Sequence, residues 1–278
     1  MRFKKIYLEI TTNCNKNCDF CGGTTRKGEF LSTENFENRL KQVANLGERI
    51  YLYLAGEPLL HPNFADFLKI AETHGVSIGV ATNGLLLEKQ FYALLSPALA
   101  ELNISLHSAE NSEEYEKLTN LALSLAEKRA DLTINFRIWN DENLTKIGAQ
   151  KRKIADNIFL HFAAPFSWGK NAEAQTNGFC YGLQSHFGIL CDGSVVPCCI
   201  CKNGEIVLGN INEKSITQIL SSPRTKAIAG GFSRRVLVEE VCQKCEFIRQ
   251  KFGASTSSAT GFAIEQERGT SILNAKPN

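Results

Sequence analysis

The sequence predicts an α/β protein: an open, partial barrel of six strand–helix units, followed by a small cysteine-rich α+β region. Through the first 165 residues, short apolar or alternating strands alternate with amphipathic helices, a pattern that favours parallel strands joined by right-handed crossovers. Six units are too few to close an eight-stranded barrel. After Pro165 the cysteine content rises. We expect a barrel over 1–165, a cysteine-rich domain over 166–252 and a flexible tail over 253–278.

The expected strands lie at 4–10, 49–54, 76–81, 102–106, 132–139 and 158–162. Helices are expected from Ser32 or Thr33 to Gly47, over 64–74, 87–95 and 112–128, and within 143–154. In the cysteine-rich region, 186–190 and 194–197 predict a hairpin around Asp192-Gly193, and 215–220 predicts a short helix.

Composition excludes several classes of protein. The 278 residues are 43% hydrophobic and 22% charged with a net charge of +2, which predicts a globular core and no nucleic-acid partner. Lys151-Arg152-Lys153 fits a solvated helix face. The chain shows no apolar run of signal-peptide or membrane-spanning length. We expect a soluble, cytoplasmic protein with no membrane contact.

Ten cysteines are unusual for such a protein, and they are clustered. Three lie between positions 14 and 21, and seven lie between 180 and 245. In a reducing compartment, clusters of this kind indicate metal sites rather than disulfides.

The first cluster, Cys14, Cys18 and Cys21, directly follows the first strand. Three thiolates can hold a four-iron cluster and leave one iron open, which is typical of a catalytic metal centre. A zinc site is the alternative, but zinc prefers four ligands, and Asp19 is the poor fourth candidate in this loop.

This C-x3-C-x2-C loop, with Phe20 before the third cysteine, resembles the signature of the radical S-adenosylmethionine (radical SAM) superfamily. The resemblance covers roughly residues 4–165 and implies a catalytic [4Fe–4S] cluster that binds S-adenosyl-L-methionine (AdoMet). Reductive cleavage of AdoMet then yields a 5′-deoxyadenosyl radical that abstracts a substrate hydrogen. The resemblance also implies a flavodoxin- or ferredoxin-type electron donor.

Further motifs follow successive strands in the order of that family. Gly56-Glu57-Pro58 resembles its GGEP stretch, with Ala55 in place of the first glycine, and Thr82-Asn83-Gly84 resembles its TNG stretch. Each motif alone is also compatible with a simple turn. The cofactor-binding residues that the resemblance implies are Phe20, Gly56, Glu57, Pro58, Asn83, Ser105 and Arg137.

Other side chains are candidates for substrate contact. His107 follows the fourth strand, where it could bind substrate or relay a proton, or be a satisfied polar residue. Trp139, His161 and Trp168 could shape the substrate pocket or simply pack.

In the second cluster, Cys180, Cys198, Cys242 and Cys245 are separated by 17, 43 and 2 residues. With DGSVVPC and LGNI, they resemble the Twitch domain, the shorter relative of the SPASM domain, which implies one auxiliary [4Fe–4S] cluster. Structural zinc fits the CxxC end too. Cys199 could replace Cys198, and Cys191 and Cys201 are left as reduced thiols.

The resemblance therefore implies an enzyme that modifies a peptide or protein, or oxidises a small metabolite, with the auxiliary cluster as electron partner. Because the chain begins at its first strand, we expect no built-in peptide-recognition domain. The alternative is a non-catalytic iron–sulfur or zinc protein for electron transfer or scaffolding.

Overall fold

A computed structural model describes residues 2–18, 21–139, 150–163 and 173–252. Its strands are β1 (Lys5–Leu8), β2 (Ile50–Tyr51), β3 (Ile78–Thr82), β4 (Leu99–Ser105), β5 (Thr133–Trp139), β6 (Gln150–Ala155), β7 (Ile158–Ala163), β8 (His186–Ile189), β9 (Ser194–Val196) and β10 (Gly209–Asn210). Its α-helices are α1 (Thr33–Val43), α2 (Phe64–Thr73), α3 (Ser112–Lys128), α5 (Ile216–Leu220), α6 (Pro223–Ser233), α7 (Glu240–Gln243) and α8 (Glu246–Phe252).

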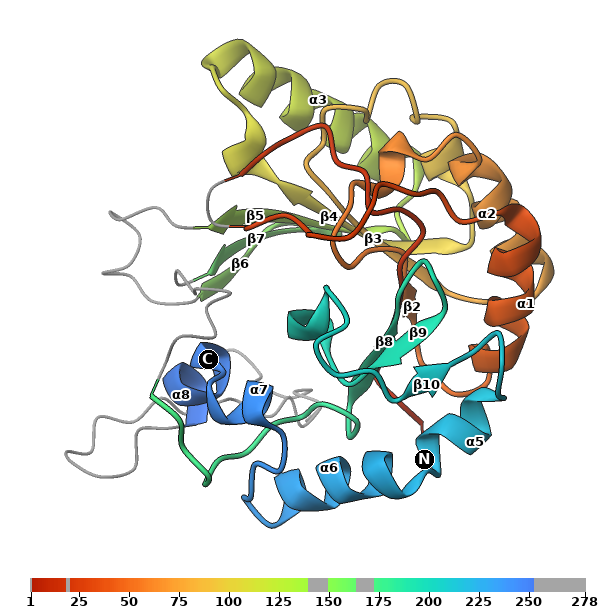
Figure 1. Cartoon of the computed structure of the whole chain (residues 1–278). Coiled ribbons are helices and arrows are strands. Elements are labelled where there is room, and N and C mark those ends of the chain that lie inside the picture. Colours follow the sequence, from red (N-terminus) through yellow and green to blue (C-terminus); the bar gives the residue numbers. More distant parts are fainter. Residues whose placement is uncertain (1, 19–20, 140–149, 164–172, 253–278) are drawn as a thin grey trace, which may run out of the picture.

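The strands form one sheet in the order β10-β9-β8-β1-β2-β3-β4-β5-β7-β6. From β8 to β7 every neighbouring pair is parallel, whereas β6, β9 and β10 pair antiparallel at the two edges. Figure 1 shows the sheet curving, with α1, α2 and α3 along its outer side. The predicted α/β class and open parallel barrel are confirmed.

The two faces of the sheet differ in polarity. On β4, Leu102 and Ile104 are fully buried, and the neighbouring α3 turns Leu118, Ala122 and Leu125 inward. The alternate residues on the other face are polar, and the register places Asn103 beside Asn135 and Ser105 beside Arg137. Because side chains alternate along a strand, the barrel has an apolar outer layer under its helices and a polar interior.

Two predicted helices are wrong. Residues 140–149 lie outside the described part, but 150–155 form β6, antiparallel to β7, so Lys151-Arg152-Lys153 lies on an edge strand and not on a helix. Charged side chains on an edge strand discourage pairing with other chains. Residues 87–95 form turns and a 3-10 helix, η2 (Ala93–Leu95). Pro97 disfavours helical backbone at Ser96 and so limits this short segment.

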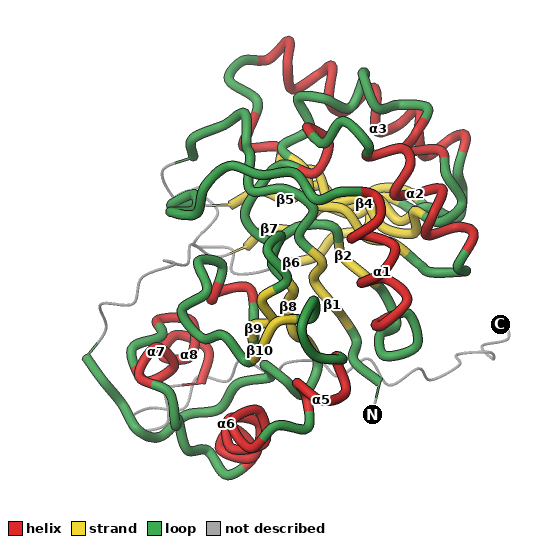
Figure 2. Tube along the Cα trace, turned by 45° about the vertical axis from the view of Figure 1, so that its right-hand side comes forward, coloured by secondary structure: helices red, strands yellow, loops and turns green. Residues whose placement is uncertain are grey.

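The cysteine-rich region contains the predicted hairpin and, after Ser215, the predicted helix α5. The sequence did not predict α6, α7 and α8, which lie together beyond the sheet in Figures 1 and 2. Since β8 pairs in parallel with β1, the sheet continues across the predicted domain boundary at 165/166. The predicted tail, 253–278, lies outside the described residues.

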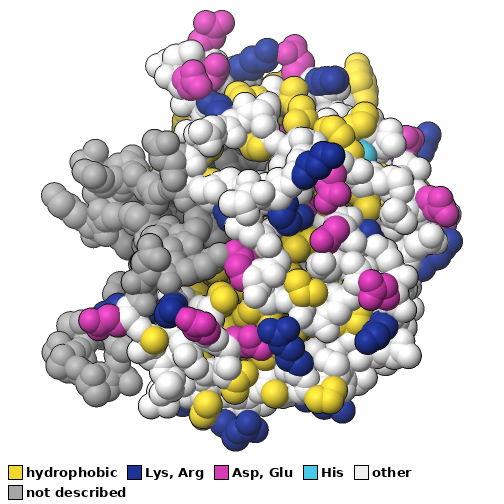
Figure 3. All heavy atoms as spheres, in the orientation of Figure 1, with side chains coloured by type: hydrophobic (Ala, Val, Ile, Leu, Met, Phe, Trp, Pro, Cys, Tyr) yellow, Lys and Arg dark blue, Asp and Glu magenta, His cyan; other side chains and the backbone are white. Residues whose placement is uncertain are grey.

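On the face seen in Figure 3, acidic and basic side chains are interspersed. Among the described residues, none of the helices has the length and apolarity that crossing a membrane requires.

Arg39 on α1 joins the first helix to the cysteine-rich region. Its buried guanidinium donates hydrogen bonds to the carbonyls of Leu190 at 3.0 Å and Cys191 at 2.9 Å. We expect Arg39→Met to lower the free energy of unfolding by about 1–3 kcal/mol, because two buried carbonyls lose a charged donor. Chemical denaturation measures this, with the exposed Lys41→Met on the same helix as the control. Equal losses in both variants would contradict the assigned role.

Candidate active site at the strand ends

The first cysteine loop leaves the end of β1 and is fixed at its base. Thr11 Oγ1 donates to the Glu29 carbonyl at 2.8 Å, and Thr12 Oγ1 donates to the Lys27 carbonyl at 2.9 Å. These bonds close residues 13–26 into a loop whose two ends lie side by side.

Within the loop the three thiols lie near one another. The Cys21 amide donates to the Cys18 carbonyl at 2.9 Å, which holds these two residues close together. Partial desolvation raises the pKa of the Cys14 thiol, a backbone hydrogen bond at Lys16 opposes this, and the nearby Glu57, Cys21 and Cys18 raise the pKa further. Cys14 remains exposed. Three thiols on one accessible turn suit a cluster with an open iron.

The Gly56-Glu57-Pro58 stretch packs directly on this loop. The Glu57 amide donates to the Asn13 carbonyl at 2.8 Å. A Cβ at position 56 would lie 2.3 Å from the Thr11 carbonyl oxygen, closer than atoms approach. Glycine at 56 is therefore required by the close approach of two backbones.

Glu57 joins the second and third strand ends. Its buried carboxylate accepts hydrogen bonds from Leu59 N at 3.0 Å, Thr82 Oγ1 at 2.7 Å and Asn83 N at 2.7 Å. Burial raises the pKa of this carboxyl to about 7, against the lowering effect of the three donors. Both oxygens are thus engaged within the protein, and Pro58 begins the 3-10 helix η1 (Pro58–Leu60) beside them.

The remaining predicted residues gather at the same edge of the sheet. Asn83 Nδ2 donates to Asn15 Oδ1 in the cysteine loop at 2.8 Å. Ser105 and Arg137 are register partners at the ends of β4 and β5. His107 lies in the 3-10 helix η3 (Leu106–Ser108), where burial lowers its pKa despite a hydrogen bond to the Arg137 backbone. Phe20 lies outside the described residues.

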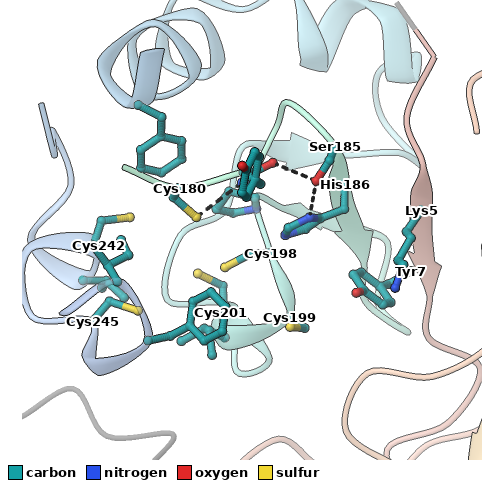
Figure 4. Close-up of a pocket in the computed structure, with 18 of the residues that line it drawn as sticks. Lys5, Tyr7, Cys180, Ser185, His186, Cys198, Cys199, Cys201, Cys242 and Cys245 are labelled. Carbon is teal, nitrogen blue, oxygen red and sulfur yellow. Dashed lines mark hydrogen bonds between the residues drawn. The ribbon is translucent and has the colours of Figure 1, made fainter. Parts of the chain in front are cut away.

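The second cysteine set lines a cavity of about 310 Å³. Cys180 precedes β8, Cys198 follows β9, Cys242 lies in α7, and Cys245 lies directly before α8. Figure 4 shows these four side chains and Cys201 around one space, with Cys199 lying toward Tyr7. The elements that bring them together are far apart in sequence.

The neighbours of each thiol distinguish Cys198 from Cys199. Burial raises the pKa values of Cys180, Cys242 and Cys245, and Cys198 is a further cause for each. Cys199, in the 3-10 helix η4 (Cys199–Cys201), also lies near Cys198 and Cys180, but it interacts in addition with Tyr7 and Lys5 on the barrel side. The Cys201 thiol hydrogen-bonds Cys198 and lowers its pKa. This arrangement favours Cys198 over Cys199 as a ligand.

Cys191 lies apart from this cavity. Its amide donates to Glu9 Oε2 at 2.9 Å, and its thiol donates to the Glu9 carbonyl at 3.5 Å. Burial raises the pKa of this thiol well above its usual value. We assign Cys191 a structural place between β1 and the hairpin.

Zinc and an iron–sulfur cluster are the two candidate occupants of the second cysteine set. Tetrahedral zinc holds its sulfur ligands within about 2.3 Å of one point. Across the described ranges, no group of three or more His, Cys, Asp or Glu side chains is arranged to hold a single metal ion. Cys180, Cys198, Cys242 and Cys245 line one cavity, and thiolate ligands of this kind serve both zinc and iron–sulfur clusters.

Sequence patterns did not reveal the residues that hold the cysteine loop from the other side, namely Glu9, Lys202 and Asn203, nor Arg26, the loop residue that binds Glu9 and Lys202. A signal was present for Glu9, because the alternation of Ile6, Leu8 and Ile10 places it on the opposite, inner face of β1. Lys202 and Asn203 carry no comparable signal beyond their position directly after Cys201.

Comparison with protein families supports this picture. Residues 8–135 match the model of the radical SAM superfamily, and residues 180–246 match the SPASM model of an iron–sulfur cluster-binding domain. Together the two models cover more than half of the chain.

Among curated proteins, a GTP 3′,8-cyclase of Aquifex aeolicus is 30% identical over 132 residues, which are 45% of this chain and 41% of that protein. An AdoMet-dependent heme synthase of Methanosarcina barkeri is 30% identical over 121 residues, which are 42% and 34%. The chain thus spans well under half the length of these curated relatives.

Solved structures match over more of the chain. BtrN in complex with AdoMet and 2-DOIA has a TM-score of 0.64 at 19% identity, over 88% of this chain and 93% of that one. The structure of anSMEcpe with bound AdoMet has a TM-score of 0.60 at 16% identity, over 88% and 84%. At these identities the likeness establishes the fold.

The Glu57 network gives a stability prediction. In Glu57→Gln the side-chain amide carries two N–H donors, and one of them must face an existing donor, Leu59 N, Thr82 Oγ1 or Asn83 N. We expect the free energy of unfolding to fall by about 1–3 kcal/mol. Denaturant titration measures the loss, and the exposed Glu48→Gln is the control. An unchanged midpoint would contradict the tie between the two loops.

The same carboxyl gives a pH prediction. Between its usual pKa of 4.5 and about 7, folded Glu57 retains a proton that the unfolded chain releases. Its contribution to stability therefore declines as pH rises through that window and is level above it. We expect melting temperatures measured across the window to show a shallower decline in Glu57→Gln. Parallel pH profiles in the two proteins would contradict the raised pKa.

Proposed function

The chain belongs to the radical SAM superfamily, and we propose that it is an enzyme that cleaves AdoMet reductively and abstracts a hydrogen atom from its substrate. One observation carries the proposal: the accessible three-cysteine loop shares direct hydrogen bonds with both the Gly56-Glu57-Pro58 and the Thr82-Asn83-Gly84 segments. These loops converge at the carboxyl ends of parallel strands, where α/β folds bind ligands.

Cys14, Cys18 and Cys21 would hold the catalytic [4Fe–4S] cluster, and Cys180, Cys198, Cys242 and Cys245 would hold the auxiliary one. The bound clusters and AdoMet supply the electron and the radical, while the protein supplies position and shielding. The backbone around Gly56 and Pro58, with Asn83, Ser105 and Arg137, would orient AdoMet, and Phe20 would complete its site.

Glu57 would contribute to AdoMet binding indirectly, by holding the two loops that it joins in place, since its oxygens already accept three hydrogen bonds. His107, held beside the Arg137 backbone, would bind substrate or move a proton. Because burial lowers its pKa, it would act as a neutral imidazole and accept a proton.

The polar barrel interior supports a polar substrate, either a small molecule or a peptide. Arg137 Nε donates to Asn103 Oδ1 at 2.9 Å, and Asn103 Nδ2 donates to Glu101 Oε1 at 2.9 Å. His161 contacts Asn135 Oδ1 at 2.9 Å, and burial lowers its pKa to about 4, so it is neutral near pH 7. The side chain of Trp139 and all of Trp168 lie outside the described residues. A flavodoxin or ferredoxin would supply the electron.

An anaerobic assay tests the proposal. We expect the reconstituted protein, given dithionite and AdoMet, to form 5′-deoxyadenosine and to contain about eight irons per chain, from two four-iron clusters. Cys14→Ala should abolish the product because the cluster loses one of three ligands. Cys191→Ala is the matched control and should keep full iron content. A fully loaded protein that forms no product would overturn the proposal and favour a non-catalytic iron–sulfur protein.

Metal analysis tests the second site separately. We expect Cys242→Ala combined with Cys245→Ala to reduce iron to about four per chain without loss of zinc. About four irons and one zinc in the parent protein would instead identify the second site as structural zinc.

A further inference from the structure

We propose that Lys202 and Asn203, which follow Cys201 beside the second site, hold the first cysteine loop in its cluster-binding shape and thereby couple the two iron–sulfur sites. The inference rests on the proposed cluster sites, but it concerns a role for residues that ligate neither cluster. It assigns Lys202 and Asn203 as positioning residues.

Lys202 contacts the loop at two points. Its ammonium donates to the Cys21 carbonyl, and its own carbonyl accepts a hydrogen bond from Arg26 Nε at 2.8 Å. Lys202 is only 5% exposed. Because Lys202 itself is buried, these part-buried bonds restrain the backbone directly after the third cysteine more than fully exposed bonds would.

Asn203 contacts the middle of the same segment. Its Oδ1 accepts hydrogen bonds from Thr24 Oγ1 at 2.8 Å and Thr25 N at 3.0 Å. Glu205 fixes the orientation of the Asn203 amide, since its Oε1 accepts from Asn203 Nδ2 at 3.2 Å and its Oε2 accepts from Asn203 N at 3.1 Å. The acceptor oxygen therefore faces the loop.

A buried ion pair continues the connection. Arg26 Nη2 donates to Glu9 Oε1 at 2.6 Å, while Glu9 Oε2 accepts from the Cys191 amide. Glu9 is fully buried and the Arg26 side chain is 15% exposed, so the pair links the loop, the end of β1 and the hairpin largely out of contact with water. From Cys21 to Arg26, the loop is thus held repeatedly by residues of the barrel interior and the second site.

The loop needs such restraint because its own sequence is flexible. Gly22 and Gly23 adopt φ values of +63° and +51°. Glycine can adopt this conformation and many others, so an unrestrained loop would sample several shapes. Fixing each residue costs about 1–2 kcal/mol of conformational entropy. The contacts from Lys202 and Asn203 order the loop before a cluster binds, and so keep the Cys21 thiol beside Cys14 and Cys18.

Coupling follows from the short connection between the sites. Lys202 directly follows η4, which Cys198 precedes, so ligation at Cys198 would stabilise the segment that holds Cys21. Linkage is reciprocal, and coupling free energies of this kind correspond to roughly 5–150-fold changes in affinity.

The test measures iron release from the first site of the reconstituted holoprotein to a chelator, followed by the AdoMet-induced change in the EPR signal of the reduced cluster. We expect Asn203→Ala and Lys202→Met each to speed release roughly 5-fold or more. Lys202→Arg should retain the donor and restore near-parental release. Exposed Asn38→Ala and Lys69→Met are the matched controls and should match the parent.

A double-mutant comparison tests the coupling itself. Removing the auxiliary cluster with Cys242→Ala should also speed release from the first site, and Asn203→Ala should add little in that background. Additive effects would overturn the coupling. If a 202 or 203 variant fails to fold, Thr24→Val removes one of the same bonds from the opposite side.

The two proposals fail differently. A parental protein with two clusters whose variants all release iron at the parental rate would overturn the role of Lys202 and Asn203 and leave the proposed function intact. A parental protein that takes up no iron at Cys14, Cys18 and Cys21 would overturn both.

Discussion

The double pairing of β1 is the constraint on which the rest of the molecule depends. This short strand pairs in parallel with β2 on one side and β8 on the other, and the first cysteine loop leaves its end. The strand supplies Ile6 and Leu8 to the core, while Glu9, directly after it, binds the loop and the hairpin. The position of β1 therefore sets where the first thiols lie relative to both the barrel and the second cysteine set.

The strand-end loops are joined by buried polar bonds rather than by apolar packing. Glu57 takes a carboxylate out of water, and its raised pKa reports the cost of that burial. Three donors offset the cost only while both loops keep their positions. Such a network favours one arrangement of the loops, because partial loss of its bonds would leave a buried charge unpaired.

Sequence patterns predicted the parts of the fold that local chemistry determines. The helix at 112–128 was predicted with its observed ends, since its apolar residues are regularly spaced and the basic Lys128 lies in its last turn. Residues 150–155 were mistaken for helix because only pairing with β7 makes them a strand. The interruption of α6 by Gly230-Gly231 concealed that helix, although Ser222-Pro223 gives a good N-terminal signal.

The candidate site was predictable where it rests on motifs and not where it rests on tertiary contacts. The cysteines, Gly56 and Asn83 could be found from their motifs. The sequence could not show that the Glu57 carboxylate accepts hydrogen bonds from Thr82 and Asn83. Lys202 gains its contact to Cys21 only through folding across 181 positions. Contacts of that range have no local signature.

The long range of these contacts also orders events during synthesis. Glu9 and its hydrogen-bond partner Cys191 are 182 positions apart, so at typical translation rates they are synthesised roughly 10–40 s apart. During that interval the first three cysteines already exist, but the hairpin and the segment that brace their loop do not. The contacts that brace this loop are therefore complete only after Lys202 and Asn203 have been synthesised and have folded against it.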